Sequence, residues 1–272
     1  MKKDMAGLVV WITGASSGIG RALAVQMASR GATVAVSARR VERLSELVDE
    51  LNAKGQEARA FPCDVTNRAA VFSVAAQIAD AIGRIDVVVA NAGFGVQGAF
   101  IDVTPDAWKR QMDVNLFGVI WTLQAAIPYL IKTKGRAAVI SSISGLLAFA
   151  NTSAYSASKF ALVGLCNSLY QELHASGVSV TNIMPGFVHS EITQVDSKGV
   201  FHEAWKDPRP SSLVWSAESA AKKITHAIMR RKREAVITGH AKVAAFMVRF
   251  LPALTYWLLA RRPISRRYAR RT

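Results

Sequence analysis

Hydrophobic residues recur along the chain in two alternating patterns. Short apolar runs predict β-strands, and the longer segments between them carry apolar residues at helical spacing. The strands are expected at Leu8–Thr13, Thr33–Ser37, Glu57–Pro62, Val87–Ala90, Ala137–Ser141, Ser179–Ile183 and Ala235–Thr238. The helices are expected near residues 18–29, 41–53, 67–82, 106–132, 153–175 and 216–232.

This alternation predicts the class of fold. Runs such as Val87–Ala90 are apolar throughout, as a parallel sheet covered on both faces requires. Strands that alternate with helices form right-handed βαβ units. We therefore expect an α/β fold, a doubly wound (Rossmann-like) parallel sheet with helices on both faces, in a single domain. The length of 272 residues, of which 51% are hydrophobic, is enough for one large domain with a sizeable core.

A glycine-rich turn joins the first strand to the first helix. It reads Thr13-Gly14-Ala15-Ser16-Ser17-Gly18-Ile19-Gly20. Glycines let the backbone turn sharply and approach a phosphate, and the free N–H groups of a helix N-terminus stabilise a pyrophosphate. The spacing differs from the more common Gly-x-Gly-x-x-Gly, and the alternative is an ordinary strand-to-helix turn. We expect a dinucleotide at this turn.

The end of the second strand indicates which dinucleotide is bound. Enzymes that prefer NAD usually carry a carboxylate there for the ribose 2′-hydroxyl. This chain reads Val36-Ser37-Ala38-Arg39-Arg40, and its first carboxylate is Glu42. Since an arginine can bind a 2′-phosphate through paired N–H groups, we predict NADP(H), held by Arg39 and Arg40. The alternative is that both arginines are solvated residues at the start of a helix.

Tyr155 and Lys159 are the candidate catalytic pair. A spacing of four residues puts both side chains on one face of a helix. An ammonium beside a phenol lowers the phenol's pKa from about 10 towards neutral pH, which would make Tyr155 a general acid/base. The spacing alone is weak evidence, because it occurs on many helices. It gains weight from the glycine turn and from Ser142 upstream.

Together these motifs resemble the short-chain dehydrogenase/reductase (SDR) family. The resemblance covers about residues 8–190, in the family's order and spacing. It rests on Thr13-Gly14-x-x-x-Gly18-x-Gly20, Asp64-Val65, Asn91-Ala92-Gly93, Asn115, Ser142, Tyr155-x-x-x-Lys159 and Pro185-Gly186. Two positions depart from the common pattern. Ala90 stands where the family often has asparagine, and Ser190 is the nearest candidate for a threonine that often follows Pro-Gly.

The resemblance implies a role for each matched residue. Tyr155 would exchange a proton with the substrate oxygen, and Lys159 would lower the Tyr155 pKa and hold the nicotinamide ribose. Ser142 would donate a hydrogen bond to the same oxygen, and Asn115 would hold a water that links Lys159 to solvent. The implied cofactor residues are Gly14, Ser16, Ser17, Gly18, Ile19 and Gly20 for the phosphates, Asp64 and Val65 for the adenine, Asn91, Ala92 and Gly93 for the ribose side, and Pro185, Gly186, Val188 and Ser190 for the nicotinamide.

The expected function is an NADP(H)-dependent oxidoreductase that interconverts a carbonyl and an alcohol on a hydrophobic small molecule by hydride transfer. One alternative is a 3-oxoacyl thioester reductase, whose acyl chain is carried by an acidic carrier protein. A second is a non-catalytic dinucleotide-binding regulator, against which Ser142, Tyr155 and Lys159 argue. Family members commonly form dimers or tetramers through the helices near 106–132 and 153–175, so a homodimer or homotetramer is expected.

We divide the chain into a dinucleotide-binding catalytic domain at residues 1–239 and a basic amphipathic extension at residues 240–272. Within the first part, residues 190–212 lack either periodicity and include Pro208 and Pro210. An irregular segment at the carboxyl ends of strands is well placed to cover a substrate. Its aromatic residues Phe201 and Trp205 could line an apolar pocket or pack within the loop.

Positive charge is concentrated after Glu234. The formal net charge is +15, and eight basic residues but no acidic one follow Glu234, which leaves +7 for residues 1–234. Such a charge favours a membrane surface or nucleic acid, but no motif supports nucleic acid, so none is expected. Apolar residues from Val243 to Leu258 follow helical spacing, whereas Arg249 and Pro252 argue against a transmembrane span. An interfacial helix on an anionic membrane fits better, the alternative being packing on the enzyme itself or on a second subunit.

Other residue types bear on the compartment. The two cysteines, Cys63 and Cys166, form no disulfide framework, which suits a reducing compartment. The apolar run Leu8–Ile12 is too short for a signal sequence. The five histidines have no metal-ligand spacing, so no metal is expected. We expect a cytoplasmic protein with possible peripheral contact with a membrane through residues 240–272.

Overall fold

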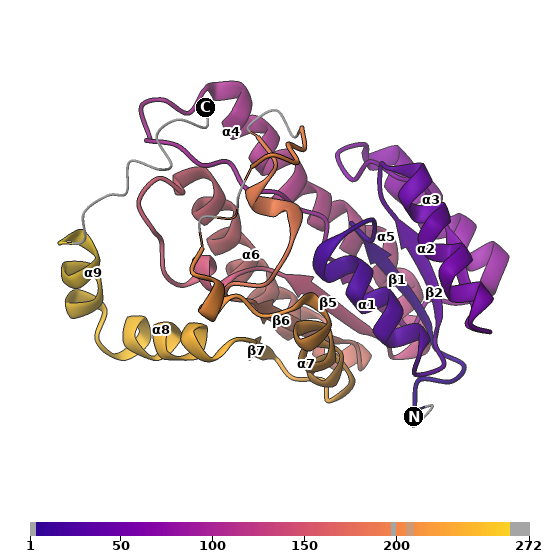
Figure 1. Cartoon of the computed structure of the whole chain (residues 1–272). Helices are drawn as coiled ribbons and strands as arrows, with labels where there is room; N and C mark the ends of the chain where they lie inside the picture. Colours follow the sequence, from indigo (N-terminus) through magenta and orange to yellow (C-terminus); the bar gives the residue numbers. More distant parts are fainter. Residues whose placement is uncertain (1–3, 197–199, 206, 208, 262–272) are drawn as a thin grey trace.

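The computed structural model describes residues 4–196, 200–205, 207 and 209–261. Within these ranges the strands form one parallel sheet in the order β3-β2-β1-β4-β5-β6-β7 (Figure 1). The strands are β1 Val9–Thr13, β2 Thr33–Ser37, β3 Ala58–Ala60, β4 Val87–Ala90, β5 Arg136–Ile140, β6 Ser179–Met184 and β7 Glu234–Val236. The predicted fold class is confirmed.

Helices cover both faces of this sheet (Figure 1). The α-helices are α1 Gly18–Ala28, α2 Val41–Ala53, α3 Arg68–Ile82, α4 Pro105–Met112, α5 Gly118–Thr133, α6 Ser153–Glu172, α7 Ala217–Met229, α8 Gly239–Phe250 and α9 Pro252–Ala260. Short helical turns lie at η1 Asp113–Phe117, η2 Ile143–Gly145, η3 His174–Ser176, η4 Glu191–Thr193 and η5 Ser211–Leu213.

The core has two layers because strand side chains alternate between the faces. In β1, Val10 and Ile12 pack with helices α1, α2 and α7. Val9 and Trp11 of the same strand pack on the opposite face, with α3, α5 and α6. Every residue of β1 is buried, which explains why the run is apolar throughout.

The order of the strands places a cleft at one end of the sheet. β1 lies between β2 and β4, so the chain leaves β1 towards one side of the sheet and later returns to pair with its other side. Crevices at such switch points, outside the carboxyl ends of the strands, are where open α/β sheets bind ligands. The glycine turn follows β1 at this point.

Two predicted helices differ from the structure. The helix expected near 106–132 is α4 and α5 joined by a π-helical turn at Asp113–Phe117, a feature that is rare and often found at functional sites. The apolar segment after residue 240 is two helices, α8 and α9, bent by 117° at Leu251. Pro252 stands at the start of α9, where its missing N–H costs no helical hydrogen bond.

The described residues of the 190–212 segment are irregular, as predicted. They contain the two short turns η4 and η5 and two isolated bridges, Val188 to Trp215 and Val195 to Phe201. Pro208 and the basic residues at 262–271 lie outside the described residues.

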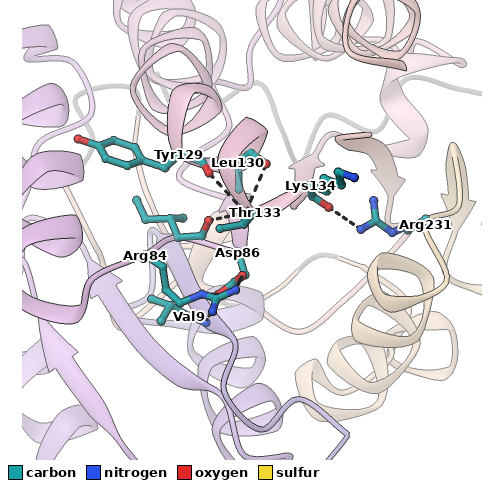
Figure 2. Close-up of polar contacts among 9 residues, drawn as sticks. Val9, Arg84, Asp86, Tyr129, Leu130, Thr133, Lys134 and Arg231 are labelled. Atoms are coloured by element: carbon teal, nitrogen blue, oxygen red, sulfur yellow. Dashed lines mark hydrogen bonds and ion pairs between the residues drawn. The ribbon is translucent and has the colours of Figure 1, made fainter. Parts of the chain in front are cut away.

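The opposite, amino-terminal end of the sheet is closed by the protein's own side chains (Figure 2). Asp86 precedes β4 and is buried. It accepts hydrogen bonds from the backbone N–H of Val9 and from Arg84 Nε, each at 2.9 Å. Thr133 precedes β5 and donates to the Ile85 carbonyl at 3.0 Å. These side chains are therefore bonded within the chain, whereas Arg136 Nε and Ser179 Oγ, at the starts of β5 and β6, are buried without a hydrogen-bond partner among the residues that the structure describes.

Arg231 adds a second set of contacts at the same end (Figure 2). It lies after α7, and its guanidinium donates to the carbonyls of Lys134 at 2.6 Å and Gly177 at 2.9 Å. These carbonyls belong to the loops that lead into β5 and β6. One arginine thus joins the starts of neighbouring strands.

Candidate active site

A cavity of about 660 Å³ lies at the carboxyl ends of the strands. It brings together residues from the glycine turn, from the ends of β2, β4, β5 and β6, and from α6. Gly20 and Asn115 are the two predicted site residues that do not line it. The predicted residues that do are Gly14, Ser16, Ser17, Gly18, Ile19, Arg39, Arg40, Asp64, Val65, Asn91, Ala92, Gly93, Ser142, Tyr155, Lys159, Pro185, Gly186, Val188 and Ser190.

The glycine turn is shaped by close backbone packing. Gly14 has a φ of +65°, and a Cβ added there would lie 2.7 Å from the Cα of Ala92. A Cβ on Gly20 would lie 2.3 Å from the carbonyl oxygen of Gly14. Gly20 therefore supports the turn from behind instead of lining the cavity. The absence of side chains at these positions leaves a cradle at a helix N-terminus that fits the phosphates of a dinucleotide.

Asn91 fixes the turn from the other half of the sheet. Its side-chain amide donates to the carbonyls of Thr13 at 3.0 Å and Gly14 at 3.1 Å. Its backbone N–H donates to Thr13 Oγ1 at 3.1 Å. The end of β4 is thereby tied to the end of β1, so Asn91 has a structural part in the cradle.

Asp64 and Val65 line the part of the cavity beyond β3. Asp64 Oδ1 accepts hydrogen bonds from the backbone N–H of Thr66 at 3.0 Å and from its hydroxyl at 2.9 Å. The cap of the following helix is Asn67, so capping does not account for Asp64. Val65 packs against Gly118, where an added Cβ would lie 2.7 Å from the valine side chain.

The two arginines after β2 differ in their contacts. Arg40 donates to Ser16 and Ser17 at 3.0 Å each and pairs with Glu191 at 2.8 Å. Arg39 is exposed and lines the cavity, and no partner is found for its guanidinium among the described residues. Arg39 is thus the cation available to an anion that enters beside β2, whereas Arg40 already holds the turn and the loop.

Glu191 joins the substrate loop to the nucleotide side of the cavity. It pairs with Arg40 and also with Arg43 of α2, at 2.5 Å. Burial alone would raise the pKa of Glu191, but hydrogen bonds from Arg40, Arg43 and Ser17 outweigh burial and hold that pKa below its ordinary value. The carboxylate therefore stays charged at neutral pH and fastens η4 across the cavity.

Ser142, Tyr155 and Lys159 meet at the end of β5. Tyr155 is half-buried and forms a side-chain hydrogen bond with Ser142. Lys159 is only 4% exposed, donates to the Ile140 carbonyl at 3.0 Å, and lies 5.6 Å from the centre of the Tyr155 ring. Ser142 Oγ also accepts from the backbone N–H of Ser144 at 3.0 Å, which orients the hydroxyl.

Burial shifts the pKa values of this group. Burial raises the pKa of Tyr155 above 10, and the hydrogen bond from Ser142 and the charge of Arg209 offset only part of that rise. Burial also lowers the pKa of Lys159 from 10.5 to about 8. Burial is the largest cause of the Tyr155 shift, and the expectation that Lys159 lowers the Tyr155 pKa stays a prediction.

Asn115 lies in the π-helical turn behind this group and is fully buried. Its side chain accepts from the Phe94 N–H at 3.0 Å and donates to the Phe94 carbonyl at 2.9 Å. Gln111 makes a matching pair of bonds around Phe94, donating to its carbonyl at 2.9 Å and accepting from the Val96 N–H at 2.6 Å. Both amides clamp the loop after β4. The water expected at Asn115 stays a prediction.

The wall after β6 is braced from behind by the start of α8. The N–H of Phe187 donates to His240 Nε2 at 3.0 Å, and the two rings lie 4.9 Å apart. A Cβ on Gly186 would lie 2.2 Å from Thr238 Oγ1, so only glycine fits there. Ser190 lines the cavity close to Gly18, where an added Cβ would lie 3.0 Å from the serine Cβ.

Several lining residues were not predicted from the sequence. Phe94, Val114, Ile140, Ile192 and Val195, with the anticipated Phe201, give the cavity an apolar portion, and Arg110 and Arg209 bring two cations. Trp205 does not line this cavity and stacks on His202 at 4.4 Å. The hydrophobic residues in segments 94–96 and 192–195 could have indicated an apolar lining. That the two segments meet at one cavity depends on tertiary contacts, which the sequence does not show.

Comparison with known proteins agrees with this geometry. The chain is 33% identical over 277 aligned positions to dehydrogenase/reductase SDR family member 7B of Bos taurus, covering 96% of this chain and 83% of that protein. A short chain dehydrogenase/reductase from Burkholderia phymatum, solved in complex with NAD, superposes with a TM-score of 0.83 at 26% identity, covering 96% of this chain and 98% of that one.

Two further solved structures bear on cofactor and substrate. A short chain dehydrogenase from Burkholderia cenocepacia in complex with NADP gives a TM-score of 0.77 at 27% identity, covering 88% and 99% of the two chains. A 3-ketoacyl-ACP reductase from Sinorhizobium meliloti gives 0.76 at 30% identity, covering 86% and 99%. The family model described as short chain dehydrogenase matches residues 8–200. The chain therefore belongs to the short-chain dehydrogenase/reductase family and is an oxidoreductase of that type.

Proposed function

We propose that the protein is an NADP(H)-dependent oxidoreductase that interconverts a carbonyl and an alcohol on a hydrophobic small molecule. The observation that carries this proposal is that Ser142, Tyr155 and Lys159 lie in the same cavity as the glycine cradle. A nucleotide whose phosphates bound at the cradle would share one cavity with these three side chains. The nicotinamide of the bound cofactor supplies or accepts the hydride.

The side chains of the chain itself handle the proton. In the direction of reduction, the Tyr155 hydroxyl protonates the substrate oxygen as the carbonyl carbon gains the hydride, and in oxidation the proton returns to Tyr155. The Ser142 hydroxyl, oriented by the Ser144 N–H, donates to the same oxygen and stabilises its developing charge. A protonated Lys159 beside the phenol stabilises the tyrosinate that forms during reduction.

The choice of NADP(H) rests on Arg39. Its guanidinium lines the cavity at the end of β2, and no carboxylate lies at that strand end in the sequence. A 2′-phosphate would supply an anion for this guanidinium, which has no partner in the described part of the chain. Relatives of known structure include proteins solved with NAD and with NADP, so the assignment depends on this residue and not on the family.

The apolar portion of the cavity supports a hydrophobic substrate. Phe94, Val114, Ile192, Val195 and Phe201 line it beside Tyr155. A second candidate is a 3-oxoacyl thioester reductase, which the similarity to the Sinorhizobium enzyme favours. The two differ in what they must accommodate, because a carrier-bound acyl chain enters with an acidic protein attached, whereas a free ketone does not.

One assay separates these functions. The purified chain is incubated with NADPH and a panel of hydrophobic ketones, aldehydes and 3-oxoacyl thioesters, and the loss of nicotinamide absorbance is followed. Oxidation with ketones or aldehydes supports the proposal, and oxidation with thioesters alone replaces it by the second candidate. Nucleotide binding without turnover on any substrate would point to a dinucleotide-binding regulator and overturn the proposal.

We also propose a homodimer or homotetramer formed through α5 and α6. These helices expose large apolar side chains, Phe117 beside α5, Ile131 on α5, and Phe160 and Tyr170 on α6. Exposed apolar side chains of this size favour burial against a second copy. Sedimentation of the purified protein measures the assembly, and a monomer at micromolar concentration would contradict it. We place the protein in the cytoplasm, in keeping with its two free cysteines.

A further inference from the structure

Helices α8 and α9 present apolar side chains to solvent. On α8, Val243 is 65% exposed, Phe246 57% and Phe250 68%. Their spacing places them on one face of the helix, while Ala241 and Ala245 are buried on the other. On α9 and at its start, large apolar residues are exposed around most of the helix, namely Leu251, Leu254, Tyr256, Trp257 and Leu258. We call these eight side chains the terminal apolar face.

A face of this kind needs a partner. Monomeric proteins rarely expose contiguous apolar surface of this extent, and such patches mark protein or membrane contacts. Phe246 and Phe250 pack together with ring centres 4.8 Å apart, so the face is continuous along α8. Only Thr255 of α9 is buried, and it bonds to its own helix, at the Leu251 carbonyl.

The charges around the face point to an anionic partner. Arg261 lies over the Trp257 ring at 3.8 Å, and Lys242 on α8 is exposed. In the sequence, eight basic residues and no acidic one follow Glu234. Aromatic and aliphatic side chains bordered by cations are the composition of helices that lie in the headgroup region of a membrane.

The geometry indicates that the segment formed by α8 and α9 lies on a membrane and does not cross it. Helices α8 and α9 together are apolar enough to span a membrane by length and composition, but they are bent by 117°. Arg249, in the middle of this segment, pairs at 2.6 Å with both carboxylate oxygens of Glu234 at the start of β7. That pair holds α8 against the body of the protein, and a straight span would have to break it.

We propose that the terminal apolar face docks into the interfacial region of an anionic phospholipid membrane. Val243, Phe246 and Phe250 of α8, with Leu254, Trp257 and Leu258 of α9, enter the boundary between headgroups and acyl chains. Lys242 and Arg261, at the two ends of the face, bind the phosphates of anionic lipids. Docking does not depend on the reaction that the active site performs.

The buried side of α8 extends the proposal to substrate access. Ala241 and Ala245 pack on Ile143, next to Ser142, and His240 braces Phe187. The helix that meets the membrane therefore packs behind residues that adjoin the active site. This part rests on the proposed function, and it identifies the substrate class as carbonyl or alcohol compounds dissolved in the membrane.

Vesicle flotation tests the docking. The full chain is mixed with vesicles of phosphatidylcholine alone or of phosphatidylcholine with phosphatidylglycerol, and the bound fraction is measured at low and high salt. We expect binding to the anionic vesicles that weakens with salt, because screening reduces the attraction of exposed charges. The double variant F250E/W257E should lower the partition coefficient by about tenfold or more, since each change puts a charge into an apolar layer. A wild-type protein that remains in solution with both vesicles overturns the proposal.

A matched variant controls for added charge. F100E/I101E introduces the same two carboxylates on an exposed apolar pair elsewhere, where Phe100 is 70% and Ile101 89% exposed. We expect it to float with the vesicles as the wild type does, and an equal loss in both variants would show that net charge, not the terminal apolar face, controls binding. NADPH titration of both variants shows that they are folded, and it is independent of turnover.

Sedimentation without lipid tests the remaining alternative, that the terminal apolar face binds a second copy of the chain. If F250E/W257E converts an oligomer to a smaller species and leaves vesicle binding unchanged, the face is a subunit contact and the proposal is wrong. For substrate access, vesicle-bound and free enzyme are compared on one lipophilic ketone with NADPH. A several-fold lower KM on vesicles supports access from the membrane. An unchanged KM overturns that part alone, and no turnover at all overturns the proposed function while leaving the docking result in place.

Discussion

The two ends of the parallel sheet are both rich in polar groups but use them differently. At the amino-terminal end, Asp86, Thr133 and Arg231 bond to backbone groups of neighbouring strands and loops. At the carboxyl end, the glycine turn leaves a cradle, Arg39 has no partner among the described residues, and Lys159 is a buried charge with one carbonyl. One end is closed by the chain, and the other is left open for a ligand.

This difference indicates which polar residues stabilise the fold and which serve its function. Buried polar groups that are fully bonded within the protein stabilise it, because their hydrogen bonds offset the cost of removing them from water. Polar groups that are kept apart, or buried without a full set of hydrogen-bond partners, lower the stability of the fold. Such groups are found where a ligand supplies the missing partners. Changes at the two ends should therefore separate into effects on folding and effects on catalysis.

The largest expected effect is at the open end. Tyr155→Phe removes the hydroxyl that transfers the proton, so kcat should fall by about 10²–10⁴-fold, the usual contribution of a general acid/base. NADPH binding should change little, because the ring remains in place. Steady-state rates and a fluorescence titration with NADPH measure the two quantities.

Tyr170→Phe is the matched control for this substitution. It makes the same change on the same helix, α6, away from the cavity, and turnover should be that of the wild type. If Tyr155→Phe kept most of its turnover, the open end would not hold the proton donor and the comparison between the two ends would fail.

The next effect is on stability at the open end. The pKa of Lys159 is lowered from 10.5 to about 8, so between these values the unfolded chain binds more protons than the folded one. The ionisation of Lys159 should then raise the free energy of unfolding by about 1 kcal/mol between pH 8 and 9. The buried thiols of Cys63 and Cys166, whose pKa values are raised, act in the opposite direction in wild type and variant alike. Lys159→Met should lack this rise, as seen in urea unfolding at the two pH values.

The exposed Lys222→Met, on α7, serves as the comparison for Lys159. It should keep the pH dependence of the wild type, because it leaves the buried Lys159 in place. The same pH dependence in wild type and Lys159→Met would show that Lys159 is not desolvated. Burial of this side chain at the open end would then not lower the stability of the fold.

The closed end should give the opposite result. Arg231→Ala removes charged donors from the Lys134 and Gly177 carbonyls, which should lower the free energy of unfolding by about 1.5 kcal/mol and leave kcat and the KM for NADPH unchanged. Arg230→Ala, an exposed neighbour, should have little effect on either. A change in KM on Arg231→Ala would mean that the two ends are not independent.

An effect of similar size concerns cofactor choice. Arg39→Ala should raise the KM for NADPH by about tenfold and leave the KM for NADH nearly unchanged, since only NADPH carries the 2′-phosphate. Arg43→Ala, which removes a nearby arginine bound to Glu191, should not discriminate between the two nucleotides. Equal changes for both nucleotides on Arg39→Ala would remove the basis for predicting NADP(H).

The sequence is informative where contacts are local. The strand runs Thr33–Ser37 and Val87–Ala90 have the predicted bounds, because burial on both faces makes their central residues apolar. Tyr155 and Lys159 share a face of α6 because their spacing is helical, and the glycine turn follows from its position between a strand and a helix.

Contacts between distant residues could not be predicted. Glu191 meets Arg43 across 148 positions, and His240 meets Phe187 across 53, and neither has a local pattern. The burial that raises the pKa of Tyr155 is likewise not visible in the sequence. Pro252 indicates a break in the last helix, but the bend of 117° depends on packing.

The bond between Asn91 and the glycine turn has a consequence for the amount of enzyme in a cell. Its two partners, Asn91 and Gly14, are 77 residues apart in the chain, so the nucleotide cradle exists only once the sheet has assembled. A nucleotide then binds the folded chain and not the unfolded one, and at a hundred times its Kd it stabilises the fold by about 2.7 kcal/mol. Degradation that starts from the unfolded chain would slow accordingly, so the cellular supply of dinucleotide would set how long each molecule of this enzyme survives.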